Sequence, residues 1–225
     1  MSLPQLLAQG GPVMYVLLVM SILATAIVLL KFWQFFRSGM RGQAFIEPAL
    51  GALRSKEQGR VIAILQGVKS PVARVMLAAV TCAADPGMRT ADVEAEVGRV
   101  GSAEIRKMES YLRGLSAIAH LSPLLGLFGT VTGMIRAFMQ VQEAGARVSA
   151  SLLAGGIWEA LLTTAFGLAV ALPAMAAYYF LEGEVDQARG TMKDVSIRIL
   201  GHFGRHPVPD LNEGGKGESE DFDGF

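Results

Sequence analysis

Three long hydrophobic runs separate this chain into segments of different polarity. Residues 13–30 form the first run, which contains no charged side chain and is closed by Lys31. Residues 114–135 form the second, interrupted only by His120, and residues 160–181 form the third. A helix needs roughly 20 apolar residues to cross a bilayer, and no alternating pattern favours a β-barrel. The pattern predicts an all-α membrane protein with three transmembrane helices, at 13–36, 114–139 and 152–181.

The polar segments between these runs have a helical pattern. Within 37–113, apolar residues recur at three- and four-residue steps, as at Val72, Val75 and Ala79. Residues 84–87 (Ala-Asp-Pro-Gly) predict a turn. Beyond it, nothing stops a helix strongly, and we expect one continuous helix from about residue 91 to about residue 140. The remaining predicted segments are an N-terminal segment at 1–12, a turn at 140–151, a cytoplasmic helix at 182–206 and a disordered acidic tail at 207–225.

Composition and charge agree with a membrane protein and suggest its orientation. Hydrophobic residues make up 52% of the chain and charged residues 18%, whereas soluble domains are about a quarter charged. The formal net charge of zero gives no reason to expect nucleic acid binding. Thirteen Lys and Arg residues lie from Lys31 to Arg113, but the turn at 140–151 holds only Arg147. The positive-inside rule therefore places the long loop and the C-terminus in the cytoplasm and the N-terminus outside.

Glu159 is the first candidate for function. It is the only charged residue between Arg147 and Glu182, and it lies inside the third span. A carboxyl group within a membrane is costly unless it faces protein or water, which makes it a functional candidate. The alternative is a hydrated glutamate near the outer interface. Thr163 lies on the same helix face as Glu159, four residues later.

Hydroxyl side chains extend this polar region across two spans. Thr130 and Thr132 lie in the second span, and Thr164 follows Thr163 in the third. In an antiparallel hairpin, Thr130 and Thr164 fall at similar depth. Together with Glu159 they predict a polar seam, although membrane threonines also commonly bond the carbonyl one turn back.

Glycine and proline positions indicate helix packing. Gly129 and Gly133, four residues apart and preceded by Gly126, allow close approach between helices. Pro123 and Pro173 each remove a backbone hydrogen bond, so they predict local distortions of their helices. We find no nucleophile–base arrangement, nucleotide-binding loop or zinc motif, and the single cysteine, Cys82, excludes an intrachain disulfide. Neither an enzyme nor a metal cofactor is therefore expected.

Two segments resemble a known family. Residues 121–138 (LSPLLGLFGTVTGMIRAF) and 155–174 (GGIWEALLTTAFGLAVALPA) resemble the second-span and third-span signatures of the MotA/TolQ/ExbB proton-channel family. Three spans and a large first cytoplasmic loop resemble its ExbB and TolQ branch. The resemblance places the family's pore glutamate on Glu159 and its two pore threonines on Thr130 and Thr164. Thr132 departs from many members, which have a bulky aromatic residue there.

The resemblance implies an ion-driven stator in the bacterial inner membrane. Members of this branch form a ring, typically a homopentamer, around an ExbD-like or TolR-like single-span dimer that carries an essential aspartate. In the ExbB case the work passes to a TonB-like protein and energises uptake across the outer membrane. Protons are the implied coupling ion, and the extra hydroxyl of Thr132 leaves sodium open. The alternatives are a TolQ-type stator serving envelope integrity and constriction, and a passive membrane scaffold.

Overall fold

The computed structural model describes residues 11–37, 43–144 and 150–205. These residues are helical with short connections, which confirms the all-α prediction for the part of the chain described. The turn predicted at 84–87 is also confirmed, because one helix ends at Ala84 and the next begins at Thr90. The helices are α2 (Gly11–Arg37), the 3-10 helix η1 (Gln43–Phe45), α3 (Ile46–Arg54), α4 (Gln58–Gln66), α5 (Pro71–Ala84), α6 (Thr90–Glu109), α7 (Leu112–Ala144) and α8 (Ala150–His202).

Three stretches of the described chain are long and apolar enough to cross a membrane, as predicted. They are Gly11–Phe35, Thr90–Glu143 and Leu153–His202. The predicted turn at 140–151 was too long, since α7 continues to Ala144 and α8 begins at Ala150. Residues 140–144 and 150–151 contain no glycine or proline that would end a helix earlier. The predicted tail at 207–225 and the segment 1–10 lie outside the described residues.

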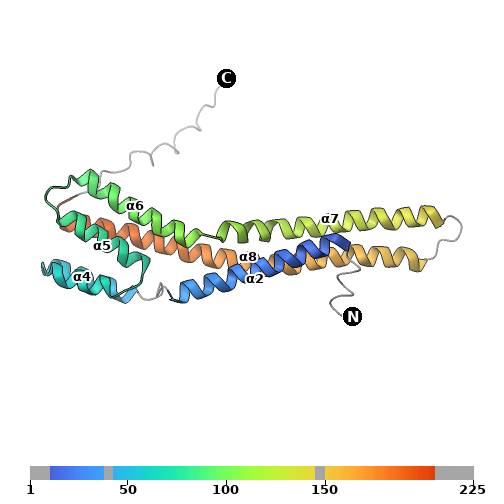
Figure 1. Ribbon diagram of the computed structural model, residues 1–225, viewed down its shortest axis with the longest axis horizontal. Helices are drawn as coiled ribbons and strands as arrows, with labels where there is room; N and C mark the ends of the chain where they lie inside the picture. The colour runs from blue at the N-terminus through green and yellow to red at the C-terminus, as the bar shows by residue number, and fades with distance from the viewer. Residues whose placement is uncertain (1–10, 38–42, 145–149, 206–225) are drawn as a thin grey trace, which may run out of the picture. The chain divides into compact units, whose positions relative to one another are not determined.

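The chain divides into two compact units. Of the described residues, the first unit contains 11–37, 104–144 and 150–188, and the second contains 43–103 and 189–205. In the first unit, α2 packs beside α7 and α7 pairs with α8 (Figure 1). Phe32 of α2 stacks on Phe180 of α8 with ring centroids 6.0 Å apart. Pro123 and Pro173 lie inside α7 and α8, which both continue through them.

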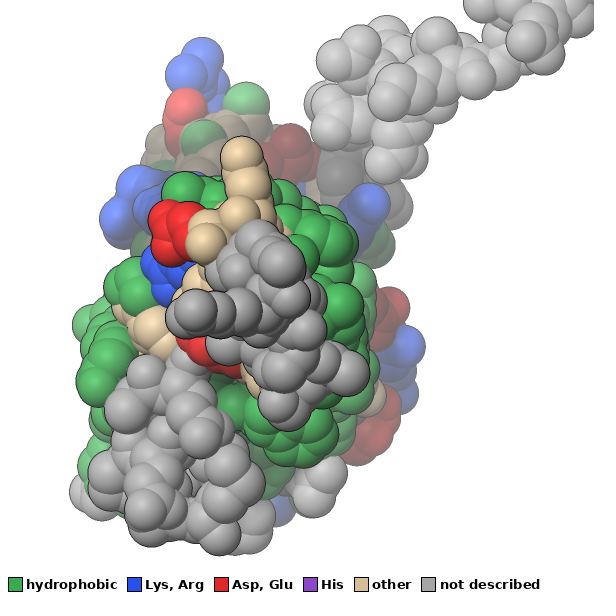
Figure 2. All heavy atoms as spheres, turned by 90° about the vertical axis from the view of Figure 1, so that its right-hand side faces the viewer, with side chains coloured by type: hydrophobic (Ala, Val, Ile, Leu, Met, Phe, Trp, Pro, Cys, Tyr) green, Lys and Arg blue, Asp and Glu red, His purple; other side chains and the backbone are tan. Residues whose placement is uncertain are grey.

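The spanning helices leave large hydrophobic side chains uncovered in the single chain. Leu29, Trp33, Leu124 and Leu172 are each 60–65% exposed. Figure 2, which faces the α7–α8 connection, shows hydrophobic side chains over most of the visible helices, with a few acidic and basic side chains between them. In water such a surface would promote aggregation, whereas lipid or further membrane helices cover it favourably.

The helix expected from residue 91 to residue 140 is broken, so that prediction was wrong. α6 ends at Glu109 and α7 begins at Leu112, and Tyr111 between them has a φ of 67°. A residue with a side chain rarely adopts this left-handed conformation. A residue distant in the sequence contacts this break, because a lysine of α2 donates to carbonyl oxygens at the end of α6.

Lys31 is that cation, and it is almost fully buried, with 1% of its surface exposed. Its Nζ donates to the carbonyl oxygen of Met108 at 2.8 Å and to Ser110 Oγ at 3.2 Å. Gln34 Oε1 accepts from the same Nζ at 3.1 Å, and the carbonyl oxygen of Lys107 lies 3.4 Å from that Nζ. A positive charge at a helix C-terminus also interacts favourably with the helix dipole. Lys31 therefore stabilises the end of α6 and fixes it to α2.

Replacing Lys31 with methionine should lower the free energy of unfolding by about 1–3 kcal/mol, because buried carbonyl groups lose their donor. The measurement is thermal unfolding of the purified protein in detergent. Lys193→Met is the matched control, since Lys193 is exposed on α8 and its loss should change stability by less than about 0.5 kcal/mol. Equal effects of the two substitutions would show that Lys31 does not hold the break.

The second unit has a small hydrophobic core of its own. Residues expected from helical spacing to face a core, such as Val72, Val75 and Ala79, are buried. Arg205 donates to the carbonyls of Asp85 and Met88 at 2.7 and 2.6 Å, which joins the chain after α8 to the turn before α6. Burial and the nearby carboxylates of Glu96 and Asp85 raise the pKa of the Cys82 thiol. Cys82 therefore remains a protonated thiol at neutral pH.

Candidate functional site

Small residues bring α7 and α8 into direct backbone contact in the first unit. A Cβ added to Gly126 would lie 3.0 Å from Thr164 Cα, and one added to Gly133 would lie 2.9 Å from Ala160 Cβ. A Cβ on Gly129 would lie 2.5 Å from Thr163 Oγ1. The three glycines predicted to pack helices therefore all face α8, as the four-residue spacing of Gly129 and Gly133 suggests.

Thr163 and Thr164 lie at this contact, and their hydroxyl groups bond to backbone of α7. Thr163 is 2% exposed, and its hydroxyl donates to the carbonyl of Ala160 at 2.7 Å, with the carbonyl of Gly126 at 3.3 Å. The Thr164 hydroxyl donates to the same Gly126 carbonyl at 2.9 Å. The two neighbouring threonines thus meet at one carbonyl of α7, although they project in different directions from α8.

A small cavity lies beside this contact, and Glu159 forms part of its wall. Its volume is about 10 Å³, which is room for one water molecule. Glu159 and Thr163 line it from α8, and Thr132 and Arg136 line it from α7. The other lining residues are Pro12, Val13, Gly129 and Gly133. The half-buried residue Glu159 therefore borders a water-sized space together with two hydroxyl-bearing residues and the exposed Arg136.

Two of the four predicted threonines, Thr130 and Thr164, lie outside this cavity lining. Thr130 donates from its hydroxyl to the carbonyl of Leu127 at 2.6 Å, one turn back in its own helix. Thr132 bonds in the same manner, to the carbonyls of Phe128 at 3.0 Å and Gly129 at 3.1 Å. The single chain therefore groups Thr132 and Thr163 with Glu159, while Thr130 is half-buried on another part of α7.

Sequence reasoning missed three residues of this region. Gly156 and Gly167 complete a row of small residues on α8, with Ala160 and Thr163 between them at steps of three and four. A Cβ on Gly167 would lie 2.6 Å from the carbonyl oxygen of Ser122, and one on Gly156 would lie 2.5 Å from Ala137 Cβ. Arg136, which directly follows the second apolar run, lies on the same helix face as Gly129 and Gly133. The spacing of these residues was the available signal.

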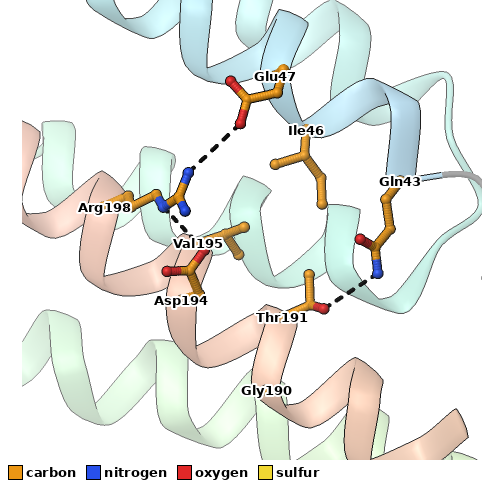
Figure 3. A pocket seen from close by; sticks show the side chains of 8 residues that line it. All are labelled: Gln43, Ile46, Glu47, Gly190, Thr191, Asp194, Val195 and Arg198. Carbon is orange, nitrogen blue, oxygen red and sulfur yellow. Dashed lines mark hydrogen bonds and ion pairs between the residues drawn. The ribbon is translucent and has the colours of Figure 1, made fainter.

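A second hollow lies in the other unit, between η1, the start of α3 and the last turns of α8. This groove has a volume of about 400 Å³. Figure 3 shows Arg198 directed towards Glu47 and Asp194, at 3.6 and 3.0 Å, and Gln43 donating to Thr191 at 3.3 Å. Its charged groups pair within the groove, so it stabilises the packing of α3 on α8. Among the described residues, no group of three His, Cys, Asp or Glu side chains is arranged to hold a metal ion.

These features define a class of protein. Long apolar helices with uncovered hydrophobic faces, and a carboxyl group within a close helix pair, are typical of an α-helical membrane protein with an internal polar pathway. The sequence profile of the MotA/TolQ/ExbB proton channel family matches residues 67–194. That match covers more than half of the chain, which therefore belongs to this family. The family is one of proton channels and not of enzymes.

Individual relatives fall in two branches of the family. An ExbB-like biopolymer transport protein of Synechocystis is 30% identical over 212 residues, which cover 90% of this chain and 82% of the relative. The Tol-Pal system protein TolQ of Haemophilus influenzae is 38% identical over 109 residues, which cover 46% of this chain and 47% of TolQ. The biopolymer transport protein ExbB of Salmonella typhimurium is 36% identical over 86 residues, covering 38% and 35%. The chain thus matches about half the length of TolQ and about a third of that ExbB.

Proposed function

We propose that this protein is an ExbB-type stator subunit of an ion-driven motor in the bacterial inner membrane. It conducts protons together with an ExbD-like partner and energises TonB-dependent transport across the outer membrane. The observation that carries this proposal is the cavity at Glu159, where a carboxyl group within a spanning helix pair shares space for one water with Thr132 and Thr163. A carboxyl group, a water molecule and hydroxyl groups are the elements of a proton pathway.

The assembly we propose is a homopentameric ring around a single-span partner dimer. The uncovered hydrophobic faces of α2, α7 and α8 support it, because they are more extensive than one chain can cover with its own side chains. Thr130 and Thr164 are proposed as further members of the ion pathway. The half-buried Thr130 would then face a neighbouring subunit or the partner instead of the cavity of its own chain.

The proposed orientation has the N-terminus and the connection between α7 and α8 in the periplasm. The segment 37–113 and the C-terminus then lie in the cytoplasm, where thirteen Lys and Arg residues from Lys31 to Arg113 agree with the positive-inside rule. Glu159, near the start of α8, falls in the periplasmic half of the membrane in this orientation. Ions would therefore reach it from the side of higher proton concentration.

A TolQ-type stator is the second candidate, and the 38% identity to the Haemophilus influenzae TolQ favours it specifically. Deleting the gene in the source bacterium distinguishes the two. We expect loss of TonB-dependent uptake with an intact envelope for the ExbB-type role, and envelope leakage or defective constriction for the TolQ-type role. A passive scaffold would tolerate Glu159→Ala and Thr130→Val in the same assays, and such tolerance would contradict both stator roles.

A further inference from the structure

We infer that four side chains near the start of α7 and in the middle of α8 form a relay through which protons leave the membrane on the cytoplasmic side. They are His120 and Ser116 of α7 and Tyr178 and Glu182 of α8. The inference rests on the proposed function, and it adds the exit step for a proton that entered at Glu159. None of the four residues belongs to the cavity lining at Glu159.

These side chains lie about one bilayer thickness away from the cavity. At about 1.5 Å per helical residue, the 19 positions from Glu159 to Tyr178 along α8 correspond to about 29 Å. The hydrocarbon core of a bilayer is about 30 Å thick. With Glu159 in the periplasmic half of the membrane, Tyr178 and Glu182 fall near the cytoplasmic interface. A pathway that begins at the cavity needs a proton acceptor at this opposite end.

Tyr178 connects the two helices through its hydroxyl group. Its Oη donates to Glu182 Oε1 at 2.6 Å, one turn further along α8. The side chain of Ser116, on α7, is hydrogen-bonded to Tyr178 as well. Because the tyrosine proton is engaged by the carboxylate, Ser116 is the donor in this second bond. The three side chains are half-buried, and they form a hydrogen-bonded chain from α7 to the carboxyl group of Glu182.

His120 continues this chain on α7. Its Nδ1 lies 2.7 Å from the carbonyl oxygen of Ser116 and 3.5 Å from Ser116 Oγ. A carbonyl oxygen can only accept, so the neutral imidazole carries its proton on Nδ1 and has Nε2 as its acceptor. The residue is exposed in the single chain, which allows Nε2 to receive a proton from outside this helix pair.

A proton can cross this chain by a series of exchanges. One proton binds at His120 Nε2, and the proton on Nδ1 passes to Ser116 Oγ. The hydroxyl proton of Ser116 then moves to Tyr178 Oη, and the tyrosine proton moves to Glu182. Glu182 releases that proton to the cytoplasm. Reorientation of the hydroxyl groups and tautomer exchange of the imidazole through water restore the starting arrangement, and His, Tyr and Glu side chains are common proton-transfer groups.

Tyr178→Phe and Tyr179→Phe form a matched pair for the test. Both keep the ring, and with it the edge contact between the two rings at 5.4 Å, but Tyr179 is 56% exposed. Each full chain is assembled with its native membrane partners and reconstituted in liposomes, where an internal pH dye follows proton flux under a potassium diffusion potential. We expect Tyr178→Phe to lower proton flux about tenfold or more, because positioned proton-transfer groups commonly contribute factors of about 10² to 10⁴. Tyr179→Phe should conduct like the wild type.

His120→Gln separates a relay from a loss of packing. His120 is exposed, so its replacement removes little packing, yet it should lower proton flux as Tyr178→Phe does. Because relay members act in series, the double variant should conduct no less than the slower single variant. Independent structural defects would instead multiply. If Tyr178→Phe does not assemble, His120→Gln carries the same expectation alone.

The possible outcomes distinguish the relay from the proposed function. Tyr178→Phe conducting protons as well as Tyr179→Phe, His120→Gln conducting like the wild type, or losses that multiply in the double variant would overturn the relay. A wild-type complex that conducts no protons would instead overturn the proposed function.

Discussion

Glu159→Gln should reduce proton flux through the reconstituted complex by about 100-fold or more while leaving the protein folded and assembled. Glutamine has nearly the same shape as glutamate but does not exchange a proton at neutral pH, and positioned proton-transfer groups commonly contribute factors of about 10² to 10⁴. The half-buried position of Glu159 in a water-sized cavity makes it the group through which this transfer is proposed to occur. The measurement is acidification of the liposome lumen under a fixed membrane potential.

Glu143→Gln is the matched control for this experiment. Glu143 lies in the last turn of α7 and is exposed, so its replacement should leave proton flux close to that of the wild type. Assembly of both variants is checked by size-exclusion chromatography. If Glu159→Gln conducts protons as well as Glu143→Gln does, the Glu159 carboxyl group is not part of the proton pathway. That result would favour the passive scaffold.

Gly167→Ala should destabilise the protein by about 1–3 kcal/mol, although alanine favours a helix more than glycine does. The new methyl group would lie 2.6 Å from the Ser122 carbonyl oxygen and 3.1 Å from Gly126 Cα. Both are backbone atoms, which cannot rotate away as a side chain can, so α7 and α8 would have to separate. Proton flux should fall as well, because the cavity at Glu159 lies in the same helix pair. Thermal unfolding in detergent measures the change in stability.

Gly183→Ala provides the comparison within the same helix. Apart from its own turns of the helix backbone, no atom lies within 4 Å of the position that its Cβ would occupy, and the higher helix propensity of alanine should stabilise the protein by up to about 1 kcal/mol. The two substitutions are therefore expected to act in opposite directions. Equal stabilisation by both would show that α7 and α8 are not in backbone contact at Gly167.

Local patterns in the sequence were sufficient for most of the fold. The apolar runs gave the three candidate spans, and helical spacing identified buried residues of the second unit such as Val75 and Ala79. These features depend on residues close in sequence, so a single chain reveals them. At the break between α6 and α7, Lys31 bonds to the Met108 carbonyl, and this bond joins residues 77 positions apart. No local pattern around Tyr111 signals that interaction.

The candidate site shows the same division between local and distant information. The isolated charge of Glu159 and its four-residue spacing from Thr163 were visible in the sequence, and the structure places both at one cavity. Arg136 reaches that cavity only because glycines let α7 lie directly against α8 and because Gly11 leaves it space. The grouping of Thr132 with Glu159 likewise depends on the helix contact. Residues brought together by helix packing are therefore the ones that sequence reasoning missed.

Native mass spectrometry of the complex extracted from its own membrane tests the proposed stator most directly. A gentle detergent keeps membrane partners attached, and the masses give both the copy number of this chain and the identity of what accompanies it. The stator proposal predicts five copies with two copies of a single-span protein that carries an aspartate in its membrane helix. A monomer or dimer, or a ring accompanied only by soluble proteins, would contradict it.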